Sequence, residues 1–198
     1  MSPDEHGPQT PEERAVQLGP GSAAAAAHAW LTAILVDERF DQAWALTDDP
    51  LRLARAQAWV LANQGFTGVS SRDRDEVAGA LESMSCDDDL WQDFAATELF
   101  AFHRAYEPDA AERRFPHLTV MSSQPRLLGP GLELVLILTH DSAAAIADLA
   151  PPDWDAWFAL GLVEIPTYAA ITMRHTQHGW VVAAHNPSLP VPGWPPRL

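Results

Sequence analysis

The stretch that decides the fold is Tyr168-Ala-Ala-Ile-Thr-Met-Arg-His-Thr-Gln-His-Gly-Trp-Val-Val-Ala-Ala-His-Asn186. In its first half, Ile171 and Met173 alternate with polar neighbours, which is the period of two typical of a half-buried strand. Gly179 closes a short polar connection, and the return run from Trp180 to His185 is rich in residues that suit a pleated sheet. The sequence therefore predicts a β-hairpin near the end of the chain.

Two more strands are predicted before this hairpin. Leu118–Ser122 is a candidate strand, and the turn residues Gly129-Pro130-Gly131 lead into Leu132–His140. The second run is apolar at nearly every position, which indicates a central strand covered on both faces. We expect helices on one face and a partner subunit on the other, so that the chain forms a homodimer through the outer face of the sheet.

The first half of the chain reads as helical. Ser22 is a suitable N-cap for a helix to about Val36, in which Trp30 and Ile34 lie on one face. Asp49-Pro50 predicts another helix start, because aspartate caps free amides and proline suits the first turn. Besides 22–36, the sequence predicts helices at about 40–46, 50–63 and 90–106, and one that begins at Ser71 or Asp73 and ends at about Ser83. In the segment 142–164, Ser142 can cap a short helix that Pro151-Pro152 ends, and 153–160 can form a further turn of helix.

The fold class expected from this order is α+β, with N-terminal helices packed against a curved, mainly antiparallel sheet. A length of 198 residues fits one domain. We assign residues 1–20 to a flexible, proline-containing arm, 21–186 to the single α+β domain and 187–198 to a proline-rich tail. We expect the tail to pack back through Trp194; the alternative is a polyproline II segment that binds a partner.

The charge of the chain excludes several function classes. The formal net charge is −15 and no lysine occurs, so the acidic surface lacks the basic stripes that nucleic acids and anionic membranes require. Cys86 is the only cysteine, which excludes an internal disulfide. His175 and His178 bracket a hairpin tip without a third ligand, so no metal is expected. The N-terminus lacks a signal peptide, and we predict a cytoplasmic protein that needs no cofactor.

Several short motifs resemble a known superfamily. Phe40-Asp-Gln-Ala-Trp-Ala-Leu46, followed by Asp49-Pro50 and later by Gly179-Trp-Val-Val182, is similar to the nuclear-transport-factor-two-like superfamily, the cystatin-like α+β cone that includes polyketide cyclases. The similarity covers about residues 22–186. It implies a curved sheet wrapped around the long N-terminal helix, with a conical cavity at the open end. Relatives include isomerases, cyclases, dehydratases, epoxide hydrolases and non-catalytic binding modules, so the fold leaves function open.

Enzymatic members of this superfamily place aspartate, often with tyrosine, histidine or arginine, on inward-facing positions. The candidates here are His140, Tyr168, Arg174 and His185, and no motif of a named enzyme matches them. His140 and Asp141 point to opposite faces of a strand and cannot form a dyad. For Arg174 the alternative role is a salt bridge at the rim. Enzymatic activity is therefore not the leading expectation.

Trp30, Trp44, Trp91 and Trp157 are candidates for the wall of a ligand pocket, the alternative being plain core. The leading hypothesis is a domain that binds a hydrophobic small molecule in a largely apolar cavity. The alternatives are an isomerase-, cyclase- or hydrolase-type enzyme and a protein-interaction or dimerisation module. They depend on which face of the 168–186 hairpin lines the cavity, because adjacent residues of a strand point to opposite sides.

Overall fold

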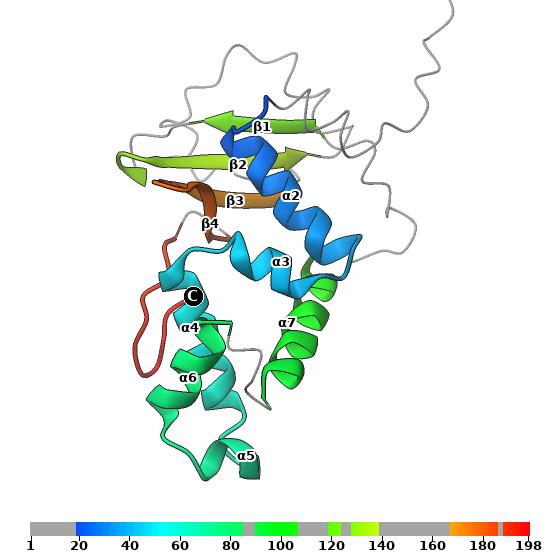
Figure 1. Ribbon diagram of the computed structural model, residues 1–198. Helices are drawn as coiled ribbons and strands as arrows, with labels where there is room; N and C mark the ends of the chain where they lie inside the picture. The colour runs from blue at the N-terminus through cyan, green and yellow to red at the C-terminus, as the bar shows by residue number, and fades with distance from the viewer. Residues whose placement is uncertain (1–18, 85–89, 107–118, 124–127, 139–166, 186–187) are drawn as a thin grey trace, which may run out of the picture.

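The computed structural model describes residues 19–84, 90–106, 119–123, 128–138, 167–185 and 188–198 (Figure 1). Within these ranges helices precede strands and the strands form one antiparallel sheet, so the predicted α+β class is confirmed. The helices are α2 (Ala23–Leu35), α3 (Phe40–Ala45), α4 (Asp49–Ala62), α5 (Thr67–Ser70), α6 (Arg74–Glu82) and α7 (Trp91–Tyr106). The strands are β1 (Thr119–Ser123), β2 (Leu132–Leu138), β3 (Thr167–Thr176) and β4 (Gly179–Ala184).

The sheet has the order β1-β2-β3-β4, which places β2 in the interior as its apolar run predicted. Val135 of β2 is the direct partner of Ile171 of β3, and both belong to the core shared with α2. Leu134 and Leu136 point to the opposite face and are buried as well. These leucines are covered within a single chain, so their burial does not require a second copy, and the homodimer stays a prediction.

Helix α2 lies across one face of the sheet (Figure 1). The hydroxyl of Ser22 accepts a hydrogen bond from the amide of Ala25 at 3.1 Å, which confirms the predicted N-cap. The small side chain of Ala27 is fully buried and allows the helix to approach closely, while Trp30 and Ile34 fill the space one and two turns further along. The face of the hairpin that carries Ile171 packs against this helix.

The corner between α3 and α4 is fastened to the hairpin. The amide of Val182 donates to the carbonyl of Leu46 and the amide of Asp48 donates to the carbonyl of Val182, each at 2.8 Å. The predicted cap at Asp49 was wrong by one residue, because α4 begins at Asp49 and Asp48 takes the N-cap position. The Asp48 carboxylate makes no capping bond, since it accepts instead from Nε of Arg174 at 2.6 Å.

The C-terminal tail returns to the helical end of the molecule, as the red trace in Figure 1 shows. Nε1 of Trp194 donates to Asp75 Oδ1 at 2.7 Å, and the amide of Gly193 donates to Gln57 Oε1 at 2.7 Å. The guanidinium group of Arg74 lies 4.7 Å from the centroid of the Trp194 ring. The prediction that the tail packs back through Trp194 is confirmed.

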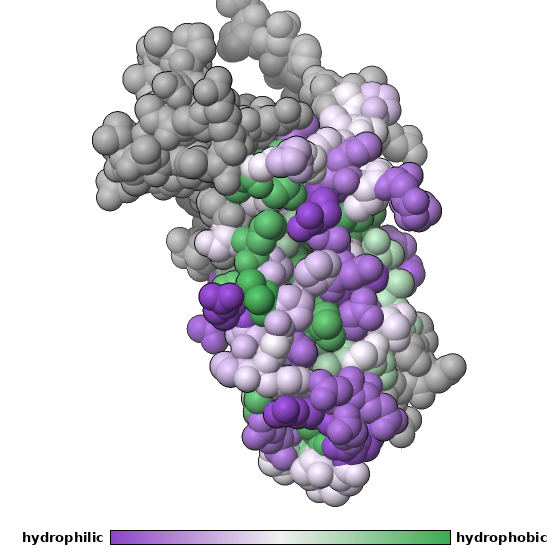
Figure 2. All heavy atoms as spheres, turned by 90° about the vertical axis from the view of Figure 1, so that its left-hand side faces the viewer, coloured by the Kyte–Doolittle hydropathy of each residue, from purple (hydrophilic) through white to green (hydrophobic). Residues whose placement is uncertain are grey.

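The surface at this helical end is hydrophilic. Figure 2 shows polar residues gathered around the lower part of the molecule, and most residues of the segment 70–76, which leads into α6, are exposed. No helix in the described ranges combines the length and the hydropathy needed to cross a bilayer.

Several predicted features lie outside the described residues. They are residues 1–18 of the predicted arm 1–20, Cys86, His140 with Asp141, and the segment 142–164 that contains Trp157.

Candidate functional site

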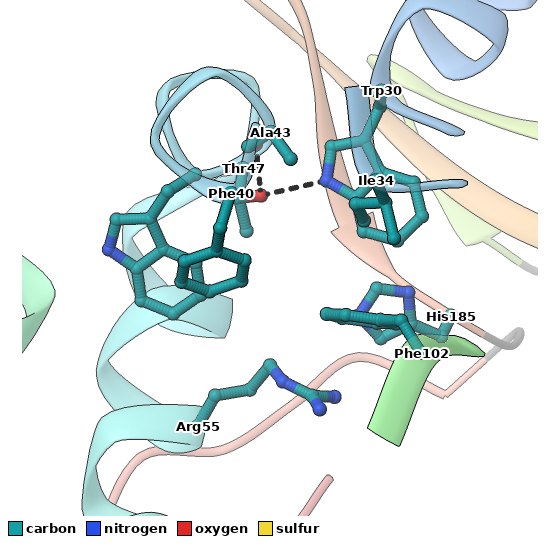
Figure 3. Close-up of a pocket in the computed structure, with 9 residues that line it drawn as sticks. Trp30, Ile34, Phe40, Ala43, Thr47, Arg55, Phe102 and His185 are labelled. Carbon is teal, nitrogen blue, oxygen red and sulfur yellow. Dashed lines mark hydrogen bonds between the residues drawn. The ribbon is translucent and has the colours of Figure 1, made fainter. Parts of the chain in front are cut away.

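The candidate site is a cleft where α2, α3, α4, α7 and the end of β4 meet (Figure 3). About 180 Å³ of space lies between the atoms there, and part of it is open to solvent. None of this space is wide enough to hold a water molecule. The cleft is therefore too narrow to hold a ligand in this conformation, and a ligand fits only when the aromatic side chains part. Its lining residues are Trp30, Ile34, Phe40, Ala43, Trp44, Thr47, Arg55, Phe102 and His185.

His185 reaches this cleft because β4 carries one extra residue. Thr172 pairs with Ala184 whereas the next residue of β3, Met173, pairs with Val182, so that Ala183 is left without a partner in the register. Such a β-bulge shifts the alternation of the strand by one position. Val182 belongs to the core against α2, and in a regular strand residue 185 would point away from that helix. The bulge returns His185 to the α2 side.

The imidazole of His185 lies among aromatic rings. Its centroid is 5.0 Å from that of Trp30, with 33° between the planes, and 5.0 Å from that of Phe102 in an edge-on arrangement. The residue as a whole keeps some exposure, yet both ring nitrogens are buried and have no hydrogen-bond partner among the described residues. Leaving a buried polar atom unpaired costs about 1–3 kcal/mol. The imidazole is therefore an unsatisfied group within an apolar wall.

The protonation state of His185 follows from these surroundings. Burial, and next the positive charge of Arg55, lower the pKa of His185 well below its ordinary value of 6.5. The ring is neutral at pH 7 and offers one N–H donor and one acceptor nitrogen. A ligand in the cleft can use either of them.

A buried ion pair lies at the side of the cleft. Nε of Arg55 on α4 pairs with Oε2 of Glu98 on α7, and the two side chains are 15% and 9% exposed. The guanidinium group of Arg55 stacks 4.5 Å from the centroid of Phe102. Figure 3 shows this group directed toward Phe102 and His185. Glu98 neutralises the charge of Arg55, so the ion pair as a whole adds no net charge to the cleft, although its planar guanidinium group is a cation.

Hydrogen bonds fix the tryptophan wall in place. Nε1 of Trp30 donates to Thr47 Oγ1 at 3.0 Å, and that hydroxyl donates to the carbonyl of Ala43 at 2.8 Å (Figure 3). Nε1 of Trp44 donates to the carbonyl of Leu81 at 3.1 Å. Both indole N–H groups are thus satisfied inside the protein, and the tryptophans offer a ligand apolar surface.

The structure brings three of the predicted site residues together: Trp30, Trp44 and His185 line the cleft. Trp91 packs behind it, with its ring centroid 5.7 Å from that of Phe40. Arg174 pairs with Asp48 and is not among the lining residues, which is the rim salt bridge weighed as its alternative role.

Two predicted site residues, His140 and Trp157, lie outside the described part of the chain. Tyr168 lies on β3, and its side chain is not among those described.

Sequence reasoning missed Arg55 and Glu98. Each interrupts an apolar stripe of residues four apart on its helix: Leu51, Arg55 and Trp59 on α4, and Phe94, Glu98 and Phe102 on α7. A charge in such a stripe is buried with its neighbours and therefore needs a partner. Two stripes with opposite charges were the signal that could have indicated this ion pair.

When its aromatic side chains part, the cleft can stack a flat apolar group between rings and bind its polar atoms through His185 and Arg55. The described residues hold no cluster of three or more side chains suited to a metal ion. The chain shows no significant match to a protein-family model, to a curated protein or to a solved structure.

Proposed function

We propose that this chain is a small-molecule-binding domain and that its ligand lies between Trp30, Phe102 and His185. The observation that carries the proposal is the buried, neutral imidazole of His185, whose two nitrogens lie in an aromatic cleft and have no partner in the part of the chain that the structure describes. A core built for stability alone gains nothing from such a residue, because an apolar side chain of the same size would avoid the penalty.

A ligand would recover the missing hydrogen bond. The N–H group or the free nitrogen of His185 would bond to one polar atom of the ligand, and the rings of Trp30 and Phe102 would cover its apolar body. Because the cleft is too narrow for a ligand in this conformation, binding would include a rotation of these rings. The ligand expected is therefore a compact hydrophobic molecule that carries at least one hydrogen-bonding group.

The proposal includes the wider expectations from the sequence. The order of three helices, α2 to α4, before antiparallel strands supports a cone of the nuclear-transport-factor-two-like type, with α2 against the inner face of the sheet. A cytoplasmic location and a homodimer rest on the sequence alone. Sedimentation of the purified protein measures the oligomeric state directly.

An isomerase-, cyclase- or hydrolase-type enzyme is the second candidate. The observation that favours it is the convergence of a neutral imidazole, which can accept a proton, with a guanidinium group, which can stabilise a developing negative charge. In this case His185→Gln would abolish turnover of a bound compound, whereas ligand affinity would change little.

The binding proposal is tested by a screen of small hydrophobic compounds that each carry one polar group. Intrinsic tryptophan fluorescence and the melting temperature are recorded together, since Trp30 lies in the cleft. A ligand at 100 times its Kd stabilises the folded state by about 2.7 kcal/mol. For a chain of this size, that corresponds to a rise in Tm of several degrees.

The variant His185→Phe should lose the response to every compound that binds. The matched control is His175→Phe, because His175 is an exposed histidine of the same hairpin that stacks against Trp180 outside the cleft. A screen without any hit, or hits that survive His185→Phe, would overturn the proposal.

A further inference from the structure

One edge of the Arg55 guanidinium is free to bind a further acceptor. Glu98 occupies Nε, and the two Nη groups have no hydrogen-bond partner among the described residues. A guanidinium presents five N–H donors in a rigid plane, and its Nη pair matches the two oxygens of a carboxylate. Arg55 therefore keeps an edge with two parallel N–H donors that can bind a carboxylate in a bidentate manner.

The plane of this fork is held in place. The group stacks on Phe102 at 4.5 Å, and the bond from Nε to Glu98 fixes its rotation about the side-chain axis. A cation that is already oriented loses little entropy when it binds a ligand. Glu98 thus acts as a positioning residue for Arg55.

The charges around the cleft also restrict the ligand. A cationic ligand would lie beside Arg55 and is disfavoured by charge repulsion. The same repulsion from Arg55 disfavours protonation of His185. A carboxylate would gain charge-assisted hydrogen bonds from Arg55, which are about twice as strong as neutral ones. The neutral His185 ring supplies one further N–H donor from the neighbouring wall.

We propose that the cleft selects flat hydrophobic carboxylates, with the carboxylate on the Nη edge of Arg55 and the N–H of His185, and the apolar body between Trp30 and Phe102. This inference rests on the proposed function and adds the chemical class of the ligand.

The test compares two compounds with the same body, 2-naphthoate and 2-naphthamide, by isothermal titration calorimetry on the full chain at pH 7.5. The wild-type protein should bind the acid about tenfold more tightly than the amide, because only the acid forms charge-assisted bonds with Arg55. The double variant Arg55→Met/Glu98→Gln removes the pair without leaving a buried charge, and it should bind both compounds with the affinity of the amide.

Two further variants complete the design. Glu98→Gln alone keeps a carbonyl oxygen that can accept the bond from Arg55 Nε and removes only the negative charge. It should therefore strengthen acid binding several-fold while leaving amide binding unchanged. Arg52→Met is the matched control, because Arg52 lies on the same helix and is 15% exposed like Arg55, but pairs with Asp49 and Glu82 outside the cleft. It should keep the full preference for the acid.

The outcomes separate the two proposals. Equal affinity for acid and amide in the wild-type protein overturns the carboxylate class and leaves the binding site standing. A preference that persists in Arg55→Met/Glu98→Gln, or acid binding that weakens in Glu98→Gln, overturns the role of Arg55. Binding of neither compound, together with a screen without hits, overturns both proposals.

Discussion

The indole of Trp30 and the imidazole of His185 lie 5.0 Å apart, centroid to centroid, yet they differ in how their polar atoms are satisfied. Nε1 of Trp30 is bonded to Thr47, whereas both nitrogens of His185 lack partners among the described residues. The fold thus satisfies the N–H group of the Trp30 indole and leaves the imidazole of His185 available for a hydrogen bond to a ligand. The first predictions concern this pair.

Replacing His185 by leucine should stabilise the protein. The change removes from an apolar wall two polar atoms that have no partner in the described ranges, and we expect the free energy of unfolding to rise by about 1 kcal/mol. Urea denaturation measures the difference, and ligand binding should be lost in the same variant. A loss of stability of similar size would mean that the imidazole makes a hydrogen bond in the folded state.

The stability should fall below about pH 6.5 through His185. The pKa of His185 is lowered in the folded state. Below the unfolded pKa of 6.5, His185 is therefore protonated in the unfolded chain while it stays neutral in the folded protein. The stability that the protein has with His185 neutral in both states is fully present above pH 6.5 and is lost as the pH falls below it. Between pH 7.5 and 5.5 the wild-type protein should lose about 1 kcal/mol more than His185→Leu. Parallel loss in both proteins would exclude this origin.

Thr47→Val should be costly although the side chain keeps its shape. The change removes the acceptor of the Trp30 indole N–H and leaves that group buried and unpaired. We expect a loss of about 1–3 kcal/mol in the free energy of unfolding. Thr47→Ser preserves the hydroxyl and should retain most of this stability in the same thermal or urea measurement.

Asp48 and Arg174 should behave as a coupled pair. Arg174 is 38% exposed, so a double-mutant cycle with Asp48→Ala and Arg174→Met should give a coupling energy of about 0.5–1 kcal/mol. Asp48 makes no capping bond, and Asp48→Ala should cost almost nothing once Arg174 is methionine. A remaining loss of about 1 kcal/mol would show that the Asp48 side chain caps α4.

Trp194→Ala should release the C-terminal tail. The change removes the hydrogen bond to Asp75 and the stacking with Arg74. A loss of about 1 kcal/mol raises the fraction of the open tail about fivefold. Limited proteolysis followed by mass spectrometry measures the rate of cleavage between residues 188 and 198. Ligand binding should be unchanged, because Trp194 does not line the cleft.

The elements with local signals were predictable from the sequence. The cap at Ser22, the alternation around Ile171 and the nearly continuous apolar run of β2 each depend on neighbouring residues, and the structure confirms all three. The helix start at Asp49 was placed one residue too late. Asp48 takes the N-cap position, and its carboxylate pairs with Arg174, which is distant in the sequence.

The site was only partly predictable, because tertiary contacts assemble it. His185 was a candidate, but nothing in Val-Val-Ala-Ala-His reveals that Ala183 is the extra residue that turns the imidazole toward α2. Arg55 and Glu98 are buried by helix packing between two apolar stripes. Helical periodicity indicates such a stripe, but it does not say which charged residue on another helix completes the pair.

The pairing of the α3–α4 corner with Val182 has a consequence for aggregation. A terminal strand such as β4 would otherwise expose unpaired amides and carbonyls to other chains, which is a common route to intermolecular strand addition. Here the amide of Val182 donates to the carbonyl of Leu46, and the carbonyl of Val182 accepts from the amide of Asp48. Thr47, between these two residues, forms a parallel β-bridge with Val182. A second molecule can extend the sheet past this point only after the corner has peeled away.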